Sequence, residues 1–271
     1  ASPMGELPGG TAFGTLVHAV LEEVDATSTE LADVVRERVR VQLARLGPAG
    51  LSVDALSGSL LPSLRTPLGP LADGLALTDI APGDRLAELD FELPLRGGDR
   101  PNGTSYLRDL ATLLREHLPA ADPLAAYADL LADPALGDSA LKGYLGGSFD
   151  VVLRVGVRDL GVDCKSNRLG SPDVPLTAWD YRGPAMAEAM LHAHYPLQAL
   201  LYDVALHRFL RWRVAGYDPE LHLGGVLYLF LRGMCGPGVV AEDGTVPGVF
   251  AWRPPAALVV AISDVLAKGP S

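Results

Sequence analysis

The sequence is poor in cysteine and has no long apolar run. Its two cysteines, Cys164 and Cys235, are too few and too far apart for a disulfide framework or a zinc ribbon. No apolar run approaches the ~18 residues that a membrane-spanning helix requires. The first ten residues have neither the charged nor the apolar region of a signal peptide. These absences predict a cytoplasmic protein that has no membrane partner.

Basic side chains are also scarce, because 22 Lys and Arg stand against 33 Asp and Glu, and the formal net charge is −11. Taken alone, this acidic balance counts against a nucleic acid as partner. There is no G-x-x-x-x-G-K-[ST] loop, so ATP hydrolysis is not expected. The apolar fraction of 48% and the length of 271 residues are those of a globular protein with a full core.

Hydrophobic periodicity predicts intermixed helices and strands. Residues 13–24 carry apolar side chains at helical spacing, and 48–83 is too irregular to indicate more than short helices and turns. The run 223–231 is almost continuously apolar, as in a strand covered on both faces. The other predicted helices are 28–46, 104–118, 122–132, 184–194, 197–213 and 254–267, and the other predicted strands are 86–95, 148–155 and 160–165. This mixture predicts an α/β or α+β domain.

Charged side chains gather where two neighbouring predicted strands meet. Asp163 and Lys165 project to one face of their strand, whereas Cys164 projects to the other. Pairing of the two strands could bring Asp150 close to Asp163. Two carboxylates and an ammonium suit a divalent cation and the hydrolysis of a phosphodiester. A salt bridge at a strand end is the alternative, and hydrolysis of small phosphates is another.

Several blocks of the sequence together resemble one family, the C-terminal nuclease domains of RecB, the helicase–nuclease subunit of RecBCD (exonuclease V), within the PD-(D/E)XK nucleases. The resemblance is dense over about 141–252, patchy at 11–25 and 86–95, and absent between. The blocks that carry it are Gly14-Thr15-Leu16-Val17-His18, Leu141-Lys142-Gly143-Tyr144, Phe149-Asp150, Val162-Asp163-Cys164-Lys165-Ser166-Asn167, Tyr195-Pro196-Leu197-Gln198, Leu201-Tyr202, Ala205-Leu206-His207-Arg208 and the run 224–233.

The resemblance implies a restriction-endonuclease-like fold, a central mixed β-sheet flanked by helices. It implies a single nuclease domain over 1–271, with a variable, mostly helical segment at about 26–135 and the nuclease core at about 141–252. The helicase motor would lie in a part of a larger enzyme that this chain lacks.

The resemblance also implies roles for individual residues. Asp150, Asp163 and His18 match metal ligands, and the backbone carbonyl of Cys164 would be a further ligand. Lys165 matches the catalytic lysine. Tyrosine is expected at position 164, so cysteine there should alter packing or DNA contact more than metal binding.

Three further matches complete the site that the resemblance implies. Gln198 and Tyr202 match a Q-x-x-x-Y motif on one helical face, where they would touch DNA or support the lysine. Glu88 matches an additional acidic residue of the site. Simpler interpretations remain open: His18 could pair with Glu22 on the surface, Glu88 could belong to a solvated strand edge, and Gln198 and Tyr202 could be isolated polar residues on a buried helix.

The expected function is therefore Mg²⁺-dependent hydrolysis of DNA, with one or two ions, in double-strand break repair and recombination. Ca²⁺ could occupy the site without supporting cleavage. The expected partners are single DNA strands delivered by a helicase, RecC- and RecD-like subunits, and a RecA-type recombinase. The alternative is a docking module with little activity of its own that contacts a partner subunit or such a recombinase.

Overall fold

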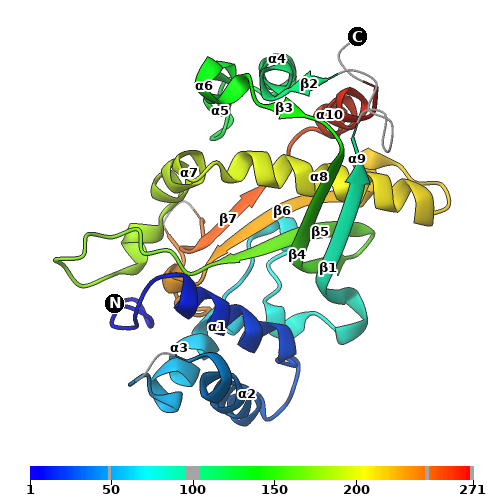
Figure 1. Cartoon of the computed structure of the whole chain (residues 1–271). Coiled ribbons are helices and arrows are strands. Elements are labelled where there is room, and N and C mark those ends of the chain that lie inside the picture. Colours follow the sequence, from blue (N-terminus) through cyan, green and yellow to red (C-terminus); the bar gives the residue numbers. More distant parts are fainter. Residues whose placement is uncertain (48–49, 96–103, 242–243, 269–271) are drawn as a thin grey trace.

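A five-stranded mixed sheet forms the centre of the molecule (Figure 1). The computed structural model describes residues 1–47, 50–95, 104–241 and 244–268. The strand order is β1-β4-β5-β6-β7; β5 and β6 are parallel, and the other neighbours are antiparallel. The strands are β1 (Arg85–Pro94), β4 (Tyr144–Val155), β5 (Arg158–Lys165), β6 (Leu223–Phe230) and β7 (Val249–Trp252). This sheet with helices on both faces confirms the predicted α/β class and is consistent with a restriction-endonuclease-like fold.

All four predicted strands are present. Every residue of β6 is buried, as its continuous apolar run predicts. β4 and β5, the two neighbouring predicted strands, pair as a hairpin that turns at Gly156 with φ 62°, a left-handed conformation that glycine adopts at little cost. β7 was not predicted, because four residues are too few to establish an alternation. A second, small sheet pairs β2 (Ser105–Tyr106) with β3 (Ala140–Leu141).

Three helices cover one face of the sheet: α1 (Thr11–Glu23), α2 (Leu31–Leu46) and α3 (Val53–Arg65). The prediction of only short helices and turns over 48–83 was wrong for α3, which has 13 residues. Pro62 inside it hides the helical pattern in the sequence, yet Leu56, Leu60 and Leu64 form one buried face that holds the helix in place. Three short 3₁₀ turns follow: η1 (Pro70–Ala72), η2 (Leu77–Asp79) and η3 (Pro82–Asp84).

The other face is covered by the long helix α8 and by helices that pack around it (Figure 1). They are α4 (Leu107–His117), α5 (Tyr127–Ala132), α6 (Pro134–Gly137), α7 (Gly183–His192), α8 (Tyr195–Arg213) and α10 (Ala256–Lys268), while α9 (Pro219–His222) leads into β6 and the 3₁₀ turns η4 (Ala178–Tyr181) and η5 (Leu231–Gly233) lie in the connections. The helix predicted over 122–132 begins only at Tyr127, because Asp122 accepts a hydrogen bond from the Leu124 N–H and holds a turn. None of the described helices is long and apolar enough to cross a bilayer.

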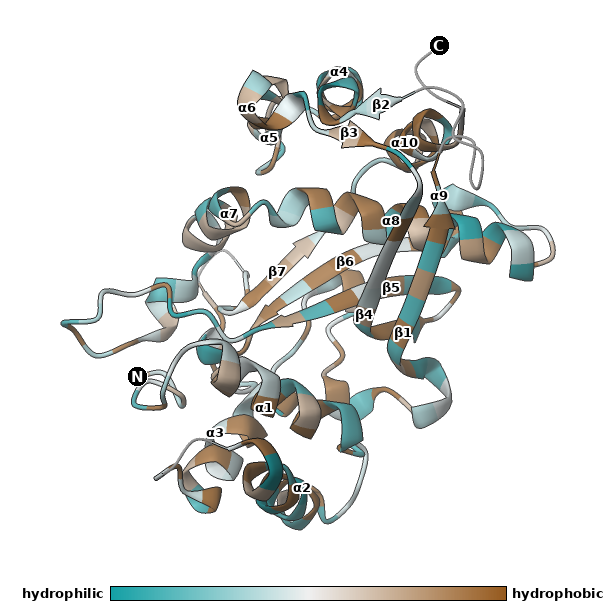
Figure 2. Ribbon diagram, in the orientation of Figure 1, coloured by the Kyte–Doolittle hydropathy of each residue, from teal (hydrophilic) through white to brown (hydrophobic). Residues whose placement is uncertain are grey.

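The two faces of the sheet support two separate apolar cores. The hydropathy colouring shows apolar residues along the central strands, which lie between the helices of the two layers (Figure 2). Val151 packs into the core under α1, but Phe149, two residues earlier in the same strand, packs into the core under α8. Residues two apart in a regular strand share a face. The side chains of β4 therefore switch from one face of the sheet to the other between these two residues, at Asp150.

In the neighbouring strand β1, the side chains switch between the two faces of the sheet at the same point. Ala87 pairs with Val151 and Leu89 pairs with Phe149, and the residues between these pairs are Glu88 and Asp150. Glu88 has φ 47°, a left-handed conformation that is costly for a residue with a Cβ. The irregularity lies where the sequence placed two of the candidate site residues.

Candidate active site

Asp163 and Lys165 project from the end of β5 toward α8, and Cys164 packs into the opposite core, as the alternation predicts. Asp163 Oδ1 accepts hydrogen bonds from Gln198 Nε2 (3.1 Å) and from the Tyr202 hydroxyl (3.2 Å). Its Oδ2 lies 2.5 Å from Lys165 Nζ but accepts no hydrogen bond of good geometry from the described residues. Burial raises the pKa of the Asp163 carboxyl, and the Lys165 ammonium opposes that rise. The Asp163 carboxylate is thus held by Gln198 and Tyr202 through Oδ1 and by the Lys165 ammonium through Oδ2.

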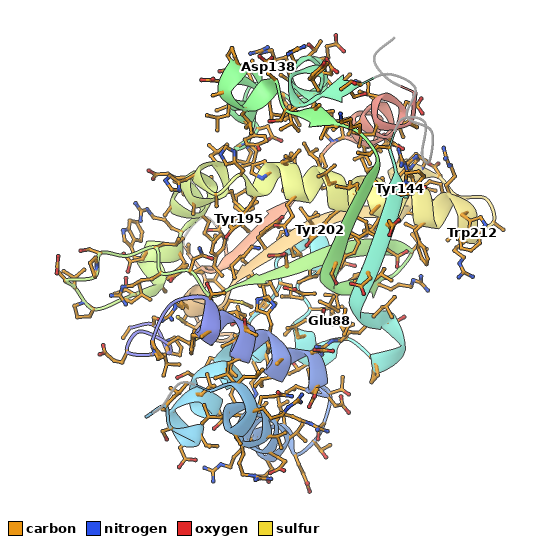
Figure 3. The ribbon with its side chains drawn as sticks, viewed as in Figure 1. Glu88, Asp138, Tyr144, Tyr195, Tyr202 and Trp212 are labelled. Carbon is orange, nitrogen blue, oxygen red and sulfur yellow. The ribbon has the colours of Figure 1, made fainter. Side chains whose placement is uncertain are left out.

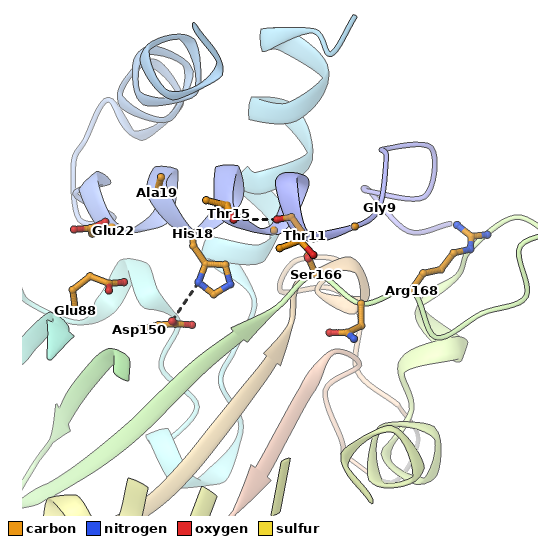
Figure 4. Close-up of a pocket in the computed structure, with 13 residues that line it drawn as sticks. Gly9, Thr11, Thr15, His18, Ala19, Glu22, Glu88, Asp150, Ser166 and Arg168 are labelled. Atoms are coloured by element: carbon orange, nitrogen blue, oxygen red, sulfur yellow. Dashed lines mark hydrogen bonds and ion pairs between the residues drawn. The ribbon is translucent and has the colours of Figure 1, made fainter. Parts of the chain in front are cut away.

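Asp150 lies on the adjoining strand and joins β5 to α1. Its Oδ2 accepts a hydrogen bond from the Cys164 N–H (2.6 Å), and its Oδ1 lies 3.2 Å from His18 Nδ1 (Figure 4). The hydrogen bond with Asp150 raises the pKa of His18, although burial opposes this. His18 therefore contacts Asp150, and the alternative of a surface pair with Glu22 is not what the structure forms.

The backbone of Cys164 faces the gap between β4 and β5. An extended residue directs its N–H and its C=O to the same edge of the strand. Since the Cys164 N–H reaches Asp150, its carbonyl faces the same gap. Burial raises the pKa of the Cys164 thiol well above its usual range, and the side chain packs into the core on the α1 side, away from Asp163 and Lys165.

Gln198 and Tyr202 share one face of α8 and form a hydrogen-bonded network around Asp163. Gln198 Nε2 donates to the Tyr202 hydroxyl oxygen (2.8 Å), and the Tyr202 hydroxyl lies 2.6 Å from the Ser148 carbonyl oxygen in β4. Tyr202 is buried, so DNA contact is less suited to it than support of Asp163. Gln198 Oε1 also lies 3.5 Å from Lys165 Nζ.

Two tyrosines that the sequence reasoning gave no role complete this network. The Tyr228 hydroxyl in β6 donates to Gln198 Oε1 (3.0 Å), and the Tyr195 ring lies 4.2 Å from Lys165 Nζ, a cation–π contact. Tyr195 belongs to a block that carries the family resemblance, so it could have been singled out. Tyr228 lies in the run 224–233, which also carries the resemblance, but its apolar neighbours in β6 gave no sign of a polar partner.

Glu88 lies beside His18 and Asp150 rather than on a solvated strand edge alone. Together with Glu22 these residues line an open cavity of about 830 Å³, whose other end is formed by Ser166, Asn167, Arg168 and the start of α1 (Figure 4). Desolvation raises the pKa of Glu88, and the nearby Glu22 and Asp150 carboxylates add to the rise. The face change at Glu88 and Asp150 is what turns both side chains toward α1.

A buried arginine, also missed in the sequence, anchors the loop that follows Lys165. Arg232 donates from Nε to the Ser166 carbonyl (2.8 Å) and from Nη1 to the Met4 carbonyl (2.7 Å) and the Leu7 carbonyl (3.1 Å). It also contacts the Pro8 carbonyl. One side chain thereby ties the end of β5 to the segment that precedes α1. These two segments lie next to residues that line the cavity, so Arg232 helps to hold the cavity in shape.

The candidate residues form two groups that meet at β5. One contains Asp150, His18 and Glu88 on the α1 side, and the other contains Asp163 and Lys165 with Gln198 and Tyr202 on the α8 side. Within the described ranges, no three His, Cys, Asp or Glu side chains are arranged so that they could hold a metal ion together. The hydrogen bond from the Cys164 N–H to Asp150 joins the two groups.

No family model matches the chain. It is 54% identical to RecBCD enzyme subunit RecB of Mycolicibacterium smegmatis, over 98% of this chain and 24% of that protein. It is 52% identical to the subunit of the same name from Mycobacterium tuberculosis H37Rv, over 99% of this chain and 25% of that protein. For Escherichia coli K12 the identity is 33%, over 97% of this chain and 20% of that protein. The chain thus spans a quarter or less of the length of these relatives.

Proposed function

Because the chain belongs to the RecB family, of whose members it matches a segment over almost all of its own length, we propose that it is a metal-dependent nuclease domain that hydrolyses DNA phosphodiester bonds. The observation that carries the proposal is the pair formed by the buried Asp163 and the partly buried Lys165, joined through Cys164 to Asp150. In this proposal the chain is the nuclease part of a RecBCD-type helicase–nuclease in the cytoplasm. It acts in double-strand break repair and recombination with RecC- and RecD-like subunits and a RecA-type recombinase.

The donor set suits a hard cation such as Mg²⁺. Asp163 Oδ2 has no partner other than the Lys165 ammonium among the described residues, Asp150 lies across the gap, and the Cys164 carbonyl faces that gap. These three groups would hold the ion, with His18 beside Asp150. Among the described residues, these side chains are not already gathered around one point. A bound Mg²⁺ would supply Lewis-acid stabilisation of the phosphoryl group and a water of lowered pKa.

Lys165 contributes a positive charge where negative charge develops. Asp163 Oδ2 lies 2.5 Å from its Nζ, and the Tyr195 ring packs against it, so the ammonium is held in place before a substrate arrives. Nζ can donate a hydrogen bond to a non-bridging phosphate oxygen and orient the attacking water. Gln198 and Tyr202 hold Asp163 so that this geometry persists.

Cleavage of a labelled oligonucleotide by the purified chain tests this proposal. We expect Mg²⁺ to support cleavage and EDTA to abolish it.

Asp163→Ala and Lys165→Ala should each lower the rate at least about a hundredfold, because each removes a preorganised charge, while the circular dichroism spectrum stays that of the wild type. Lys142→Ala, which removes an exposed lysine before β4, is the matched control and should cleave normally. Full activity in either site variant, or cleavage in EDTA, would contradict the proposal. Binding of a single strand without cleavage would favour the docking module instead.

A further inference from the structure

The C-terminal end of α8 carries an exposed aromatic and basic patch, which we call the α8 patch (Phe209, Arg211, Trp212 and Arg213). Trp212 is 75% exposed and points away from the body of the molecule (Figure 3). The Arg213 guanidinium lies 4.3 Å from the centre of a Trp212 ring and 5.7 Å from that of Phe209. The stacked guanidinium and rings present flat surfaces to solvent.

Among the residues that the structure describes, no carboxylate forms an ion pair with the arginines of the α8 patch. Arg208, one turn earlier, is tied to Ser263 and to the Pro94 carbonyl. In contrast, neither Arg211 nor Arg213 forms an ion pair or a hydrogen bond among the described residues. In a chain of net charge −11, two such arginines beside an exposed indole favour a polyanionic ligand.

A groove of about 300 Å³ lies beside the α8 patch and shares Phe209 with it. Its apolar lining comes from Leu86, Leu89 and Val152 of the strands and from Leu206, Phe209 and Leu210 of α8, and the charged side chains Asp84, Arg85, Arg154 and Asp159 line it as well. Arg85 lines both this groove and the small cavity formed by His18, Glu88 and Asp150. Along α8, Tyr202 and Trp212 are ten residues apart, or about 15 Å. The patch is therefore within reach of one strand that also enters the site.

We propose that the α8 patch binds a single-stranded segment of the nucleic acid substrate, a few nucleotides from the phosphate that is cleaved. This inference rests on the proposed function. Bases would stack on Trp212, and Arg211 and Arg213 would contact phosphates. Stacking and phosphate contacts are both indifferent to base sequence, which suits an enzyme that must process any strand.

Binding of a 5′-fluorescein-labelled (dT)20 and (dT)4, followed by fluorescence anisotropy at several salt concentrations, tests the inference. All proteins carry Asp163→Asn, so that no cleavage occurs and the α8 patch is intact. Trp212→Ala should weaken (dT)20 binding about five- to 150-fold, since stacking on one ring contributes about 1–3 kcal/mol. It should leave (dT)4 bound at the site unchanged.

The charge variant is Arg211→Ala/Arg213→Ala. Losing two phosphate contacts should lower the slope of log K against log salt by about 1.4, at about 0.7 per contact. Arg36→Ala/Arg40→Ala removes two exposed arginines from α2 and changes the net charge equally, so it is the matched control and should keep the slope.

Three results would overturn the inference: no (dT)20 binding by the parent protein, the same affinity in Trp212→Ala, or equal slopes in the two double-arginine variants. An unchanged affinity and slope would make the patch a surface for a partner protein. The proposed function fails separately, through normal cleavage by Asp163→Ala or Lys165→Ala in the otherwise wild-type chain.

Discussion

Two buried aspartates differ in how the protein accommodates their charge. Asp163 accepts hydrogen bonds from Gln198 and Tyr202 and lies beside Lys165. Asp203, one residue after Tyr202 in α8, is buried as deeply, and neither of its oxygens has a hydrogen-bond partner among the described residues. Burial raises the pKa of Asp203 to about 8. The Asp163 carboxylate has neighbours that can stabilise its charge, whereas the Asp203 carboxyl is accommodated because it is protonated.

Asp203→Asn should stabilise the protein, and the gain should grow with pH. The carboxyl of the unfolded chain ionises near pH 4, whereas that of the folded chain stays protonated up to about pH 8. The stability that the neutral group contributes is therefore complete below pH 4 and is lost as the pH rises to about 8. Denaturation of variant and wild type at pH 5 and pH 8 should show a gain of at most about 5 kcal/mol at pH 8 and much less at pH 5. Equal gains at both values would contradict the assignment. The exposed Asp173→Asn is the control.

At the scale of secondary structure, the face change shared by β1 and β4 shapes the candidate site. Glu88 keeps φ 47° although glycine would adopt it with less strain. Backbone strain of this kind persists where the surrounding structure enforces it, often near functional residues. Here it turns Glu88 toward the cavity that His18 and Asp150 line.

Glu88→Gly and Glu88→Ala separate the side chain from the backbone. Both remove a carboxylate that lies near Glu22 and Asp150, but only glycine also relieves the left-handed strain. We expect Glu88→Gly to be more stable than Glu88→Ala by about 1 kcal/mol in urea denaturation. Both should cleave DNA more slowly, to the same extent, if the carboxylate serves the reaction. Equal stability of the two variants would mean that position 88 carries no strain.

Arg232 connects elements that are far apart in the sequence, and its removal should loosen them together. Its fully buried side chain reaches the carbonyls of Ser166, Met4 and Leu7. Arg232→Ala leaves several buried acceptors unpaired and should cost about 3 kcal/mol or more of unfolding free energy. Arg232→Lys keeps the charge but loses the planar fork, so it should be intermediate. Thermal denaturation checks the order, and an alanine variant as stable as the lysine variant would contradict it.

For the whole molecule, metal binding should appear as stability. A ligand that binds only the folded chain stabilises it in proportion to ln(1 + [L]/Kd). If Asp150 and Asp163 hold Mg²⁺, adding the ion should raise the Tm of the wild type by a few degrees, and EDTA should reverse the rise. Asp150→Asn, compared with and without Mg²⁺, should show no such rise, and NaCl of equal ionic strength serves as the control. The same Tm rise in the variant would place the ion elsewhere.

Much of this fold could be predicted from local patterns. The alternation along β5 determined that Asp163 and Lys165 share a face and that Cys164 turns away, and the spacing of Gln198 and Tyr202 determined that both lie on one side of α8. These are short-range consequences of strand and helix geometry, so they need no knowledge of the rest of the chain. The helix α3 escaped prediction because Pro62 disguised a pattern that packing of Leu56, Leu60 and Leu64 restores.

The sequence by itself determined the net charge of −11 and the face of the strand on which Asp163 and Lys165 lie, because both depend only on residue types and on local geometry. Only the tertiary structure decided which groups meet. The contact of His18 with Asp150, the turning of Glu88 into the cavity and the anchoring by Arg232 all join segments separated by tens to hundreds of residues. Such contacts depend on where strands pair and where the sheet changes faces, and neither is encoded in the periodicity of a single segment.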